Sequence, residues 1–98
     1  MYIDDFVWLT EIASKVATKH RVTPDEAEEV FFNNPRYRFV ESGHRAGEDV
    51  YSAGGQTDAG RYLQVVYSPD PAGDSVFVIT AYPLTGKALQ AYRRRQRR

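Results

Sequence analysis

The stretch covering residues 48–82 constrains the fold of this chain more than any other part of its sequence. It contains two segments rich in β-branched and aromatic residues, residues 61–67 (RYLQVVY) and residues 75–82 (SVFVITAY), a composition typical of strands. Residues 48–53 form a third strand candidate ahead of them. Both faces of residues 61–67 are largely apolar, which predicts a central strand that is covered on both sides.

Short turns separate these three segments. Gly54 and Gly55, followed by residues 58–60, are predicted to end the first segment, and residues 69–73 separate the second segment from the third. Connections this short predict antiparallel neighbours, because a parallel return needs a crossover of about a dozen residues or more. We therefore expect an antiparallel meander.

Two helices are predicted before the sheet. In residues 11–20 the apolar side chains recur on one helical face, and Thr10 is expected to be the N-cap. Thr23, Pro24 and Glu26 predict a capping box for the second helix, with proline at the first helical position. Residues 33–35 (NNP) predict its end. The expected buried positions of the two helices are Ile12, Ala13, Val16, Ala17, Ala27, Val30 and Phe31.

The remaining segments complete the order of elements. Residues 2–8 are expected to form a short edge strand or an extended lead-in, and residues 36–40 a strand with Arg36 and Arg38 on its wet face. A last helix, capped by Thr85, is expected to turn Leu89 and Tyr92 inward. The predicted order β-α-α-β-β-β-β-α describes an α+β fold with two N-terminal helices, an antiparallel four-stranded β-meander and a C-terminal helix.

Length and composition limit the class of protein. A chain of 98 residues is expected to form one domain, residues 1–98, and without cysteine it has neither disulfides nor a thiolate metal site. No apolar run approaches the roughly 20 residues that cross a bilayer, and acids stand near the amino terminus, where a signal peptide carries positive charge. We therefore expect a cytoplasmic protein that does not contact a membrane.

The formal net charge of zero conceals an uneven distribution. Residues 87–98 contain six basic residues and no acid, whereas the rest of the chain contains all 13 acids and seven bases. The basic tail at residues 93–98 is either an exposed terminus that favours solubility or a surface for phosphates or for an acidic protein.

Several motifs resemble one known family along nearly the whole chain. Lys19-His20, residues 22–27 (VTPDEA) and Val30-Phe31 are similar to its amino-terminal pattern, and residues 48–51 (EDVY), 55–63 (GQTDAGRYL) and 78–81 (VITA) to its carboxy-terminal half. The family is that of the BrnT toxins of type II toxin–antitoxin systems. The resemblance implies a RelE-like fold and a ribonuclease activity that stops translation. It also implies a BrnA-like ribbon-helix-helix antitoxin as the partner, so that operator DNA is bound only indirectly, through the complex.

The chain departs from the family pattern at four positions. Ile12 and Val16 stand where members usually have a lysine and an asparagine on the first helix. Gln56 and Tyr82 replace two arginines of the predicted sheet, both of which would be natural partners for phosphate. The residues that still match are Lys19, His20, Arg61 and Lys87.

Cleavage of RNA without a metal needs a base for the 2′-hydroxyl, cations beside the phosphorane and an acid for the leaving oxygen. His20 is the candidate acid or base, because an imidazole exchanges a proton near neutral pH; the alternative is a partly buried histidine bonded to the backbone. Lys19, Arg61 and Lys87 are the candidate catalytic cations. The alternatives are solvated lysines and, for Arg61, an ion pair with Glu48 or Asp49.

Contacts with RNA are expected from the sheet and from the tail. The candidates are Arg36, Arg38, Tyr82, Arg93 and Arg94, with a solvated strand face and a core tyrosine as the alternatives. His44, beside Arg45 in a polar loop, is expected to be a plain exposed histidine. No metal or other cofactor is expected, because two histidines without cysteine make no strong metal constellation.

Three functions are compatible with these features. The first is an enzyme, a BrnT-like ribonuclease toxin. The second is a diverged member of the same fold that has lost turnover and binds RNA or an antitoxin. The third is an interaction module whose arginine tail docks on an acidic partner.

Overall fold

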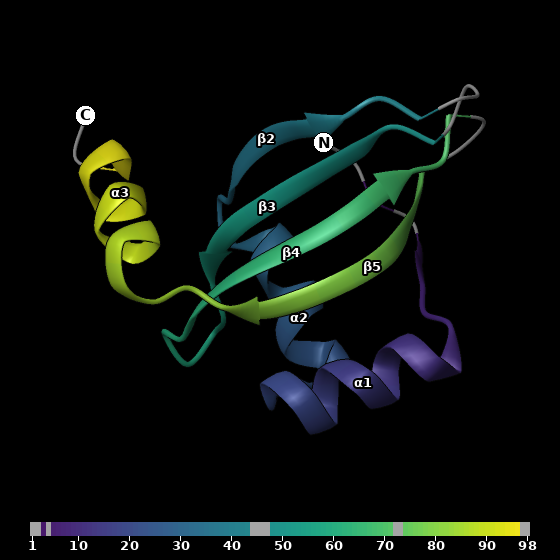
Figure 1. Ribbon diagram of the computed structural model, residues 1–98, viewed down its shortest axis with the longest axis horizontal. Coiled ribbons are helices and arrows are strands. Elements are labelled where there is room, and N and C mark those ends of the chain that lie inside the picture. Colours follow the sequence, from purple (N-terminus) through teal and green to yellow (C-terminus); the bar gives the residue numbers. More distant parts are fainter. Residues whose placement is uncertain (1–2, 4, 44–47, 72–73, 97–98) are drawn as a thin grey trace.

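The computed structural model of the protein describes residues 3, 5–43, 48–71 and 74–96, and its fold is α+β (Figure 1). The helices are α1 (Thr10–His20), α2 (Pro24–Phe32) and α3 (Gly86–Gln96). The strands are β1 (Asp5–Val7), β2 (Arg36–Glu41), β3 (Val50–Gln56), β4 (Tyr62–Pro69) and β5 (Ser75–Pro83). The order of elements along the chain is the predicted one.

The strands form a five-stranded sheet in the order β1-β5-β4-β3-β2. The meander from β2 to β5 is antiparallel throughout, as its short connections predict. β1 pairs in parallel with β5, with Phe6 opposite Val76. Of the two forms expected for residues 2–8, the described part is therefore the short edge strand.

Gly54 and Gly55 lie inside β3, where the sequence predicts a break, and this prediction is wrong. Both glycines are buried and paired with β4. A Cβ on Gly54 would lie 2.6 Å from Oε1 of Gln64, and one on Gly55 would lie 3.3 Å from Cγ1 of Val30. The two glycines therefore permit close approaches within the sheet and to α2, and the turn comes later, at Gly60, where φ is 91°.

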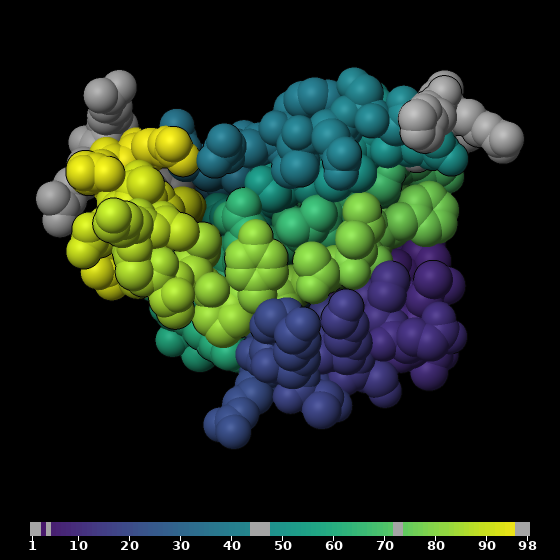
Figure 2. Space-filling model, viewed as in Figure 1, coloured from purple at the N-terminus to yellow at the C-terminus, as the bar shows by residue number. Residues whose placement is uncertain are grey.

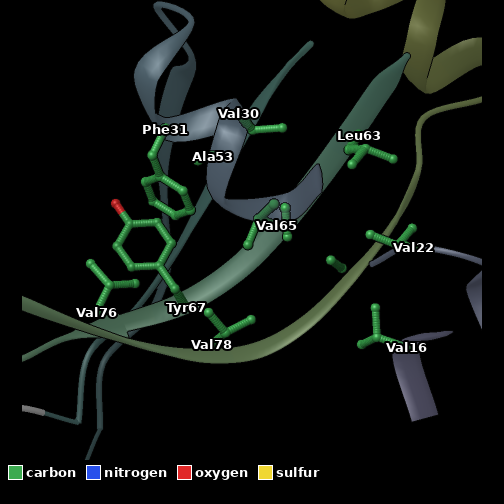
Figure 3. Close-up of a cluster of buried hydrophobic side chains, with 12 residues drawn as sticks. Val16, Val22, Val30, Phe31, Ala53, Leu63, Val65, Tyr67, Val76 and Val78 are labelled. Atoms are coloured by element: carbon green, nitrogen blue, oxygen red, sulfur yellow. The ribbon is translucent and has the colours of Figure 1, made fainter. Parts of the chain in front are cut away.

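The core lies between α1, α2 and one face of the sheet (Figure 1). Valines and one leucine fill its centre, and an aromatic cluster around Phe31 and Tyr67 closes one end (Figure 3). Burying a side chain of this size stabilises the fold by about 1.5 to 3 kcal/mol. The largest fully buried side chains are Leu63, Val16, Val22, Val30, Val65 and Val76.

The capping box of α2 is confirmed. The amide of Glu26 donates to the Thr23 hydroxyl at 3.1 Å, and the Thr23 amide donates to Oε1 of Glu26 at 3.0 Å. The prediction for α1 needs correction, because Leu9 is its N-cap and Thr10 is already helical, with no side-chain cap bond. Leu9 is still extended after β1, so the helix begins one residue earlier than predicted. The inward face of α1 is also narrower, since Ala17 is exposed.

Within the described part of the chain, α3 is the helix that reaches the other face of the sheet. The Tyr92 ring meets the Tyr62 ring edge to face at 5.7 Å, and the Arg93 guanidinium lies 5.0 Å from the centroid of Tyr62. Leu89 and Tyr92 are half-buried, as expected, and the Leu89 amide donates to the carbonyl of Thr85. β4 is the central strand, but on this face its side chains are half-buried, so its cover is less complete than predicted.

Candidate functional site

The face of the sheet opposite α1 and α2, which we call the open face, carries several of the predicted site residues. Strand pairing aligns Arg36, Gly54, Gln64 and Tyr82 in one row across β2, β3, β4 and β5. Directly paired residues share a face, and alternate residues of β4 point into the core. The row therefore lies on the open face. Arg38 belongs to the neighbouring row, two residues further along β2.

A pocket of about 130 Å³ lies between the open face and α3. Arg36 and Arg38 line it from β2, and Arg95 lines it from α3. Gly54 and Gln64 contribute from the centre of the sheet. The described residues that line this pocket include no acid, so its electrostatic character is positive.

His20 and Tyr82 meet at the β5 side of the sheet, where Tyr82 pairs with the pocket residue Gln64. Their ring centroids are 6.0 Å apart, with an angle of 54° between the ring planes, and both side chains are half-buried. His20 is the last residue of α1, and Lys19 beside it is exposed. β1 pairs with β5 only as far as Phe77, so α1 approaches the edge of β5 beyond this residue.

The first turn of α3 lies close to the same end of β5. Lys87 is exposed in that turn, and α3 begins three residues after Pro83 ends the strand. Figure 2 shows the end of β5 (yellow-green) between α3 (yellow) and α1 (violet-blue). We call the region around Lys19, His20 and Tyr82 the corner, and Lys87 lies five residues further along the chain than Tyr82.

Arg61 is engaged by the two helices of the core layer. Its Nη1 donates to the carbonyl of Arg21 at 2.6 Å and to both carboxylate oxygens of Glu26 at 3.2 Å. Its Nη2 donates to the carbonyl of His20 at 3.3 Å. The ion pair expected with Glu48 or Asp49 is therefore formed with Glu26 instead.

This contact also satisfies backbone groups at the end of α1, whose last carbonyls have no partner inside the helix. Arg61 fixes the backbone of His20 and leaves the imidazole to face Tyr82. The Thr23 amide, and after it Arg61, hold the pKa of Glu26 below its ordinary value.

Gln56 stands where the resembled family has an arginine, and its side chain closes the turn between β3 and β4. Its Nε2 donates to the carbonyl of Gly60 at 3.1 Å. Its backbone carbonyl accepts from Nδ2 of Asn33 at 3.0 Å, which ties the same turn to the end of α2. The side chain at this position is therefore engaged by the protein itself.

Tyr92 and Arg95 are members of the pocket that the sequence analysis did not single out as site residues. Their signal is helical spacing, because Ala88, Ala91, Tyr92 and Arg95 fall on one face of α3 at intervals of three and four. Arg93 lies on Tyr62, and Arg94 is exposed. His44 and Arg45 lie outside the described residues.

The described ranges of the chain contain no group of three His, Cys, Asp or Glu side chains arranged to hold a metal ion. No helix in them is long and apolar enough to cross a membrane.

The fold is that of a known ribonuclease toxin. The 1.1 Å crystal structure of BrnT, a ribonuclease toxin from Brucella abortus, matches this chain with a TM-score of 0.60 and 17% sequence identity. The match covers 84% of this chain and 97% of that chain. No family model matches the sequence, and no curated protein does. The structural match confirms the predicted BrnT-like α+β fold.

Proposed function

We propose that the protein is a ribonuclease toxin that cleaves RNA without a metal ion and thereby inhibits translation in the cytoplasm. The observation that carries this proposal is the contact between His20 and Tyr82, beside Lys19, at the end of β5 in a BrnT-like fold. An imidazole, a phenol and an ammonium group together supply the proton transfer and the positive charge that RNA cleavage requires.

The reaction assigned to the corner is an intramolecular phosphoryl transfer within the RNA. His20 removes the proton of a 2′-hydroxyl, and the 2′-oxygen attacks the neighbouring phosphorus. The bond to the 5′-oxygen then breaks as that oxygen takes a proton from solvent water, and the His20 imidazolium returns its proton to the solvent. Lys19 and Lys87 stabilise the charge on the phosphorane. Tyr82 orients the imidazole and donates its hydroxyl to a phosphate oxygen. Arg61 acts as a positioning residue, because it fixes the backbone of His20.

The substrate strand is held by cations of the open face and of α3. Arg36 and Arg38 lie on β2, and Arg93 lies in the last turn of α3. Arginine suits this role because its planar donors match the oxygens of a phosphate. We also propose a BrnA-like ribbon-helix-helix antitoxin as the cellular partner, with contact to operator DNA only through that complex.

Growth arrest in a bacterial host tests the proposal. Expression of the wild-type protein is expected to reduce colony recovery and incorporation of labelled amino acids by about 100-fold or more, and Lys19→Ala or His20→Ala to restore both. Lys15→Ala is the matched control, because Lys15 is an exposed lysine one turn earlier on α1. The folding of each variant is checked on purified protein. Growth arrest by Lys19→Ala and His20→Ala at the wild-type level would refute the assigned roles.

A second candidate function is RNA binding without turnover. The observations that favour it are the engagement of Arg61 by Glu26 and of Gln56 by Gly60, because the protein itself then occupies two side chains suited to bind phosphate. This alternative predicts an affinity for RNA that falls steeply with salt, together with intact RNA after long incubation.

A further inference from the structure

We infer that the pocket between the open face and α3 binds one phosphate group of an RNA strand, beside the corner where cleavage is proposed. The inference rests on the proposed function, since it specifies how the substrate is held. The pocket volume of about 130 Å³ corresponds to roughly four water molecules of about 30 Å³ each, enough for one phosphate group.

The charge of the pocket favours an anion. Arg36, Arg38 and Arg95 bring three guanidinium groups to one hollow. Within the described residues no carboxylate pairs with any of these three arginines. Like charges placed around one cavity repel, so binding of an anion relieves this repulsion and forms charge-assisted hydrogen bonds.

Small residues keep the pocket open. Gly54 has no side chain, and a Cβ there would lie 2.6 Å from Oε1 of Gln64 and 3.6 Å from Cδ1 of Tyr92. Ala88 and Ala91 leave space on the side of α3. Gln64 supplies an amide at the floor, and Tyr92 supplies a ring at the wall on which a base can stack. A phosphate with an attached nucleoside fits this combination better than an isolated carboxylate does.

The pocket occupies the β2, β3 and β4 positions of the row that ends at Tyr82 on β5, in the corner. Arg36 and Tyr82 are separated by β3 and β4, so three interstrand spacings of about 4.8 Å place their Cα atoms about 14 Å apart. A single strand of RNA that follows this row is anchored at β2 and reaches His20 at β5.

The test compares Arg95→Gln with Arg94→Gln. Both residues are exposed in the last turn of α3 and the substitutions remove the same charge, but only Arg95 lines the pocket. Binding of a fluorescent 12-nucleotide 2′-O-methyl RNA is measured by anisotropy between 50 and 300 mM salt. This RNA has no free 2′-hydroxyl to attack, so binding is read independently of cleavage.

Arg95→Gln is expected to weaken binding about tenfold and to reduce the salt slope by about 0.7, the value for one lost phosphate contact on a single strand. Arg94→Gln is expected to change the affinity less than about twofold. Ala91→Glu, which adds a carboxylate on the side of the pocket, is expected to weaken binding at least as much as Arg95→Gln. Thermal melting confirms that each variant is folded.

Three results would overturn the inference. The first is an equal loss of RNA affinity in Arg94→Gln and Arg95→Gln, and the second is no binding of the RNA by the wild-type protein. The third is displacement of the RNA by a polyglutamate peptide as effectively as by unlabelled RNA. The last result would identify a site for an acidic protein. Displacement by inorganic phosphate only at millimolar concentration, with tight binding of the oligonucleotide, supports an RNA phosphate over free phosphate. A loss of RNA affinity in Arg95→Gln but not in Arg94→Gln, together with no cleavage of unmodified RNA, would support the phosphate site and refute the proposed ribonuclease function.

Discussion

At the scale of single residues, Arg61 joins the sheet to both helices of the core layer. Its guanidinium contacts the carbonyls of His20 and Arg21 and the carboxylate of Glu26, across 35 to 41 positions of sequence. A sequence motif identifies this arginine, but its partners are set by the packing of α1 and α2 against β4. For this reason the sequence supports a phosphate ligand and a structural role equally well.

Arg61→Ala is expected to lower the free energy of unfolding by about 1 to 3 kcal/mol, because it leaves two carbonyls and a carboxylate without their donor. Urea denaturation followed by the fluorescence of Trp8 measures the change. Arg38→Ala is the control, an exposed strand arginine whose loss is expected to change stability by less than about 0.5 kcal/mol. Equal losses of stability in Arg61→Ala and Arg38→Ala would contradict this structural role of Arg61.

His20 is easier to place from sequence than to interpret. The apolar stripe of α1 predicts that it is partly buried, and it is. The aromatic partner is Tyr82, which lies 62 positions away and comes near only because α1 packs along the free part of β5. No local sequence pattern predicts the contact between His20 and Tyr82.

At the scale of elements, local signals were the most predictive. The capping box of α2 involves residues three apart, so the sequence contains all of its determinants. The glycines of β3 show the opposite case. Their role depends on Gln64, Val30 and Pro35, which approach from other elements, and a pair of glycines read alone resembles a turn.

The cap of α2 predicts how stability depends on pH. Because the folded-state pKa of Glu26 lies below its ordinary value, ionised Glu26 stabilises the fold above the ordinary carboxyl range, and this contribution is lost as pH falls through the folded-state pKa. The difference in melting temperature between wild type and Glu26→Gln is therefore expected to be largest near pH 7 and to shrink between about pH 5 and 3. Melting curves at several pH values measure it, and a difference independent of pH would count against this account.

At the scale of the whole molecule, the order of elements and the antiparallel meander follow from strand composition and short turns. The sequence does not predict the parallel pairing of β1 with β5 or the position of α3 over the open face. Each of these contacts joins segments that no local sequence pattern links. The pocket depends on this last contact. The alternation of side chains along β2 identifies Arg36 and Arg38 as neighbours on one face. Only the folded structure shows that Arg95 joins them in the pocket.

The most direct test of the ribonuclease function is cleavage of a labelled mixed-sequence RNA by the purified protein in excess chelator, with and without translating ribosomes. His20→Ala is the comparison, and it is expected to fold because Arg61 contacts the backbone of His20 rather than its ring. Cleavage by the wild-type protein is expected to survive the chelator and to be lost in His20→Ala. Intact RNA in every reaction with folded wild-type protein, or equal cleavage by His20→Ala, would contradict it.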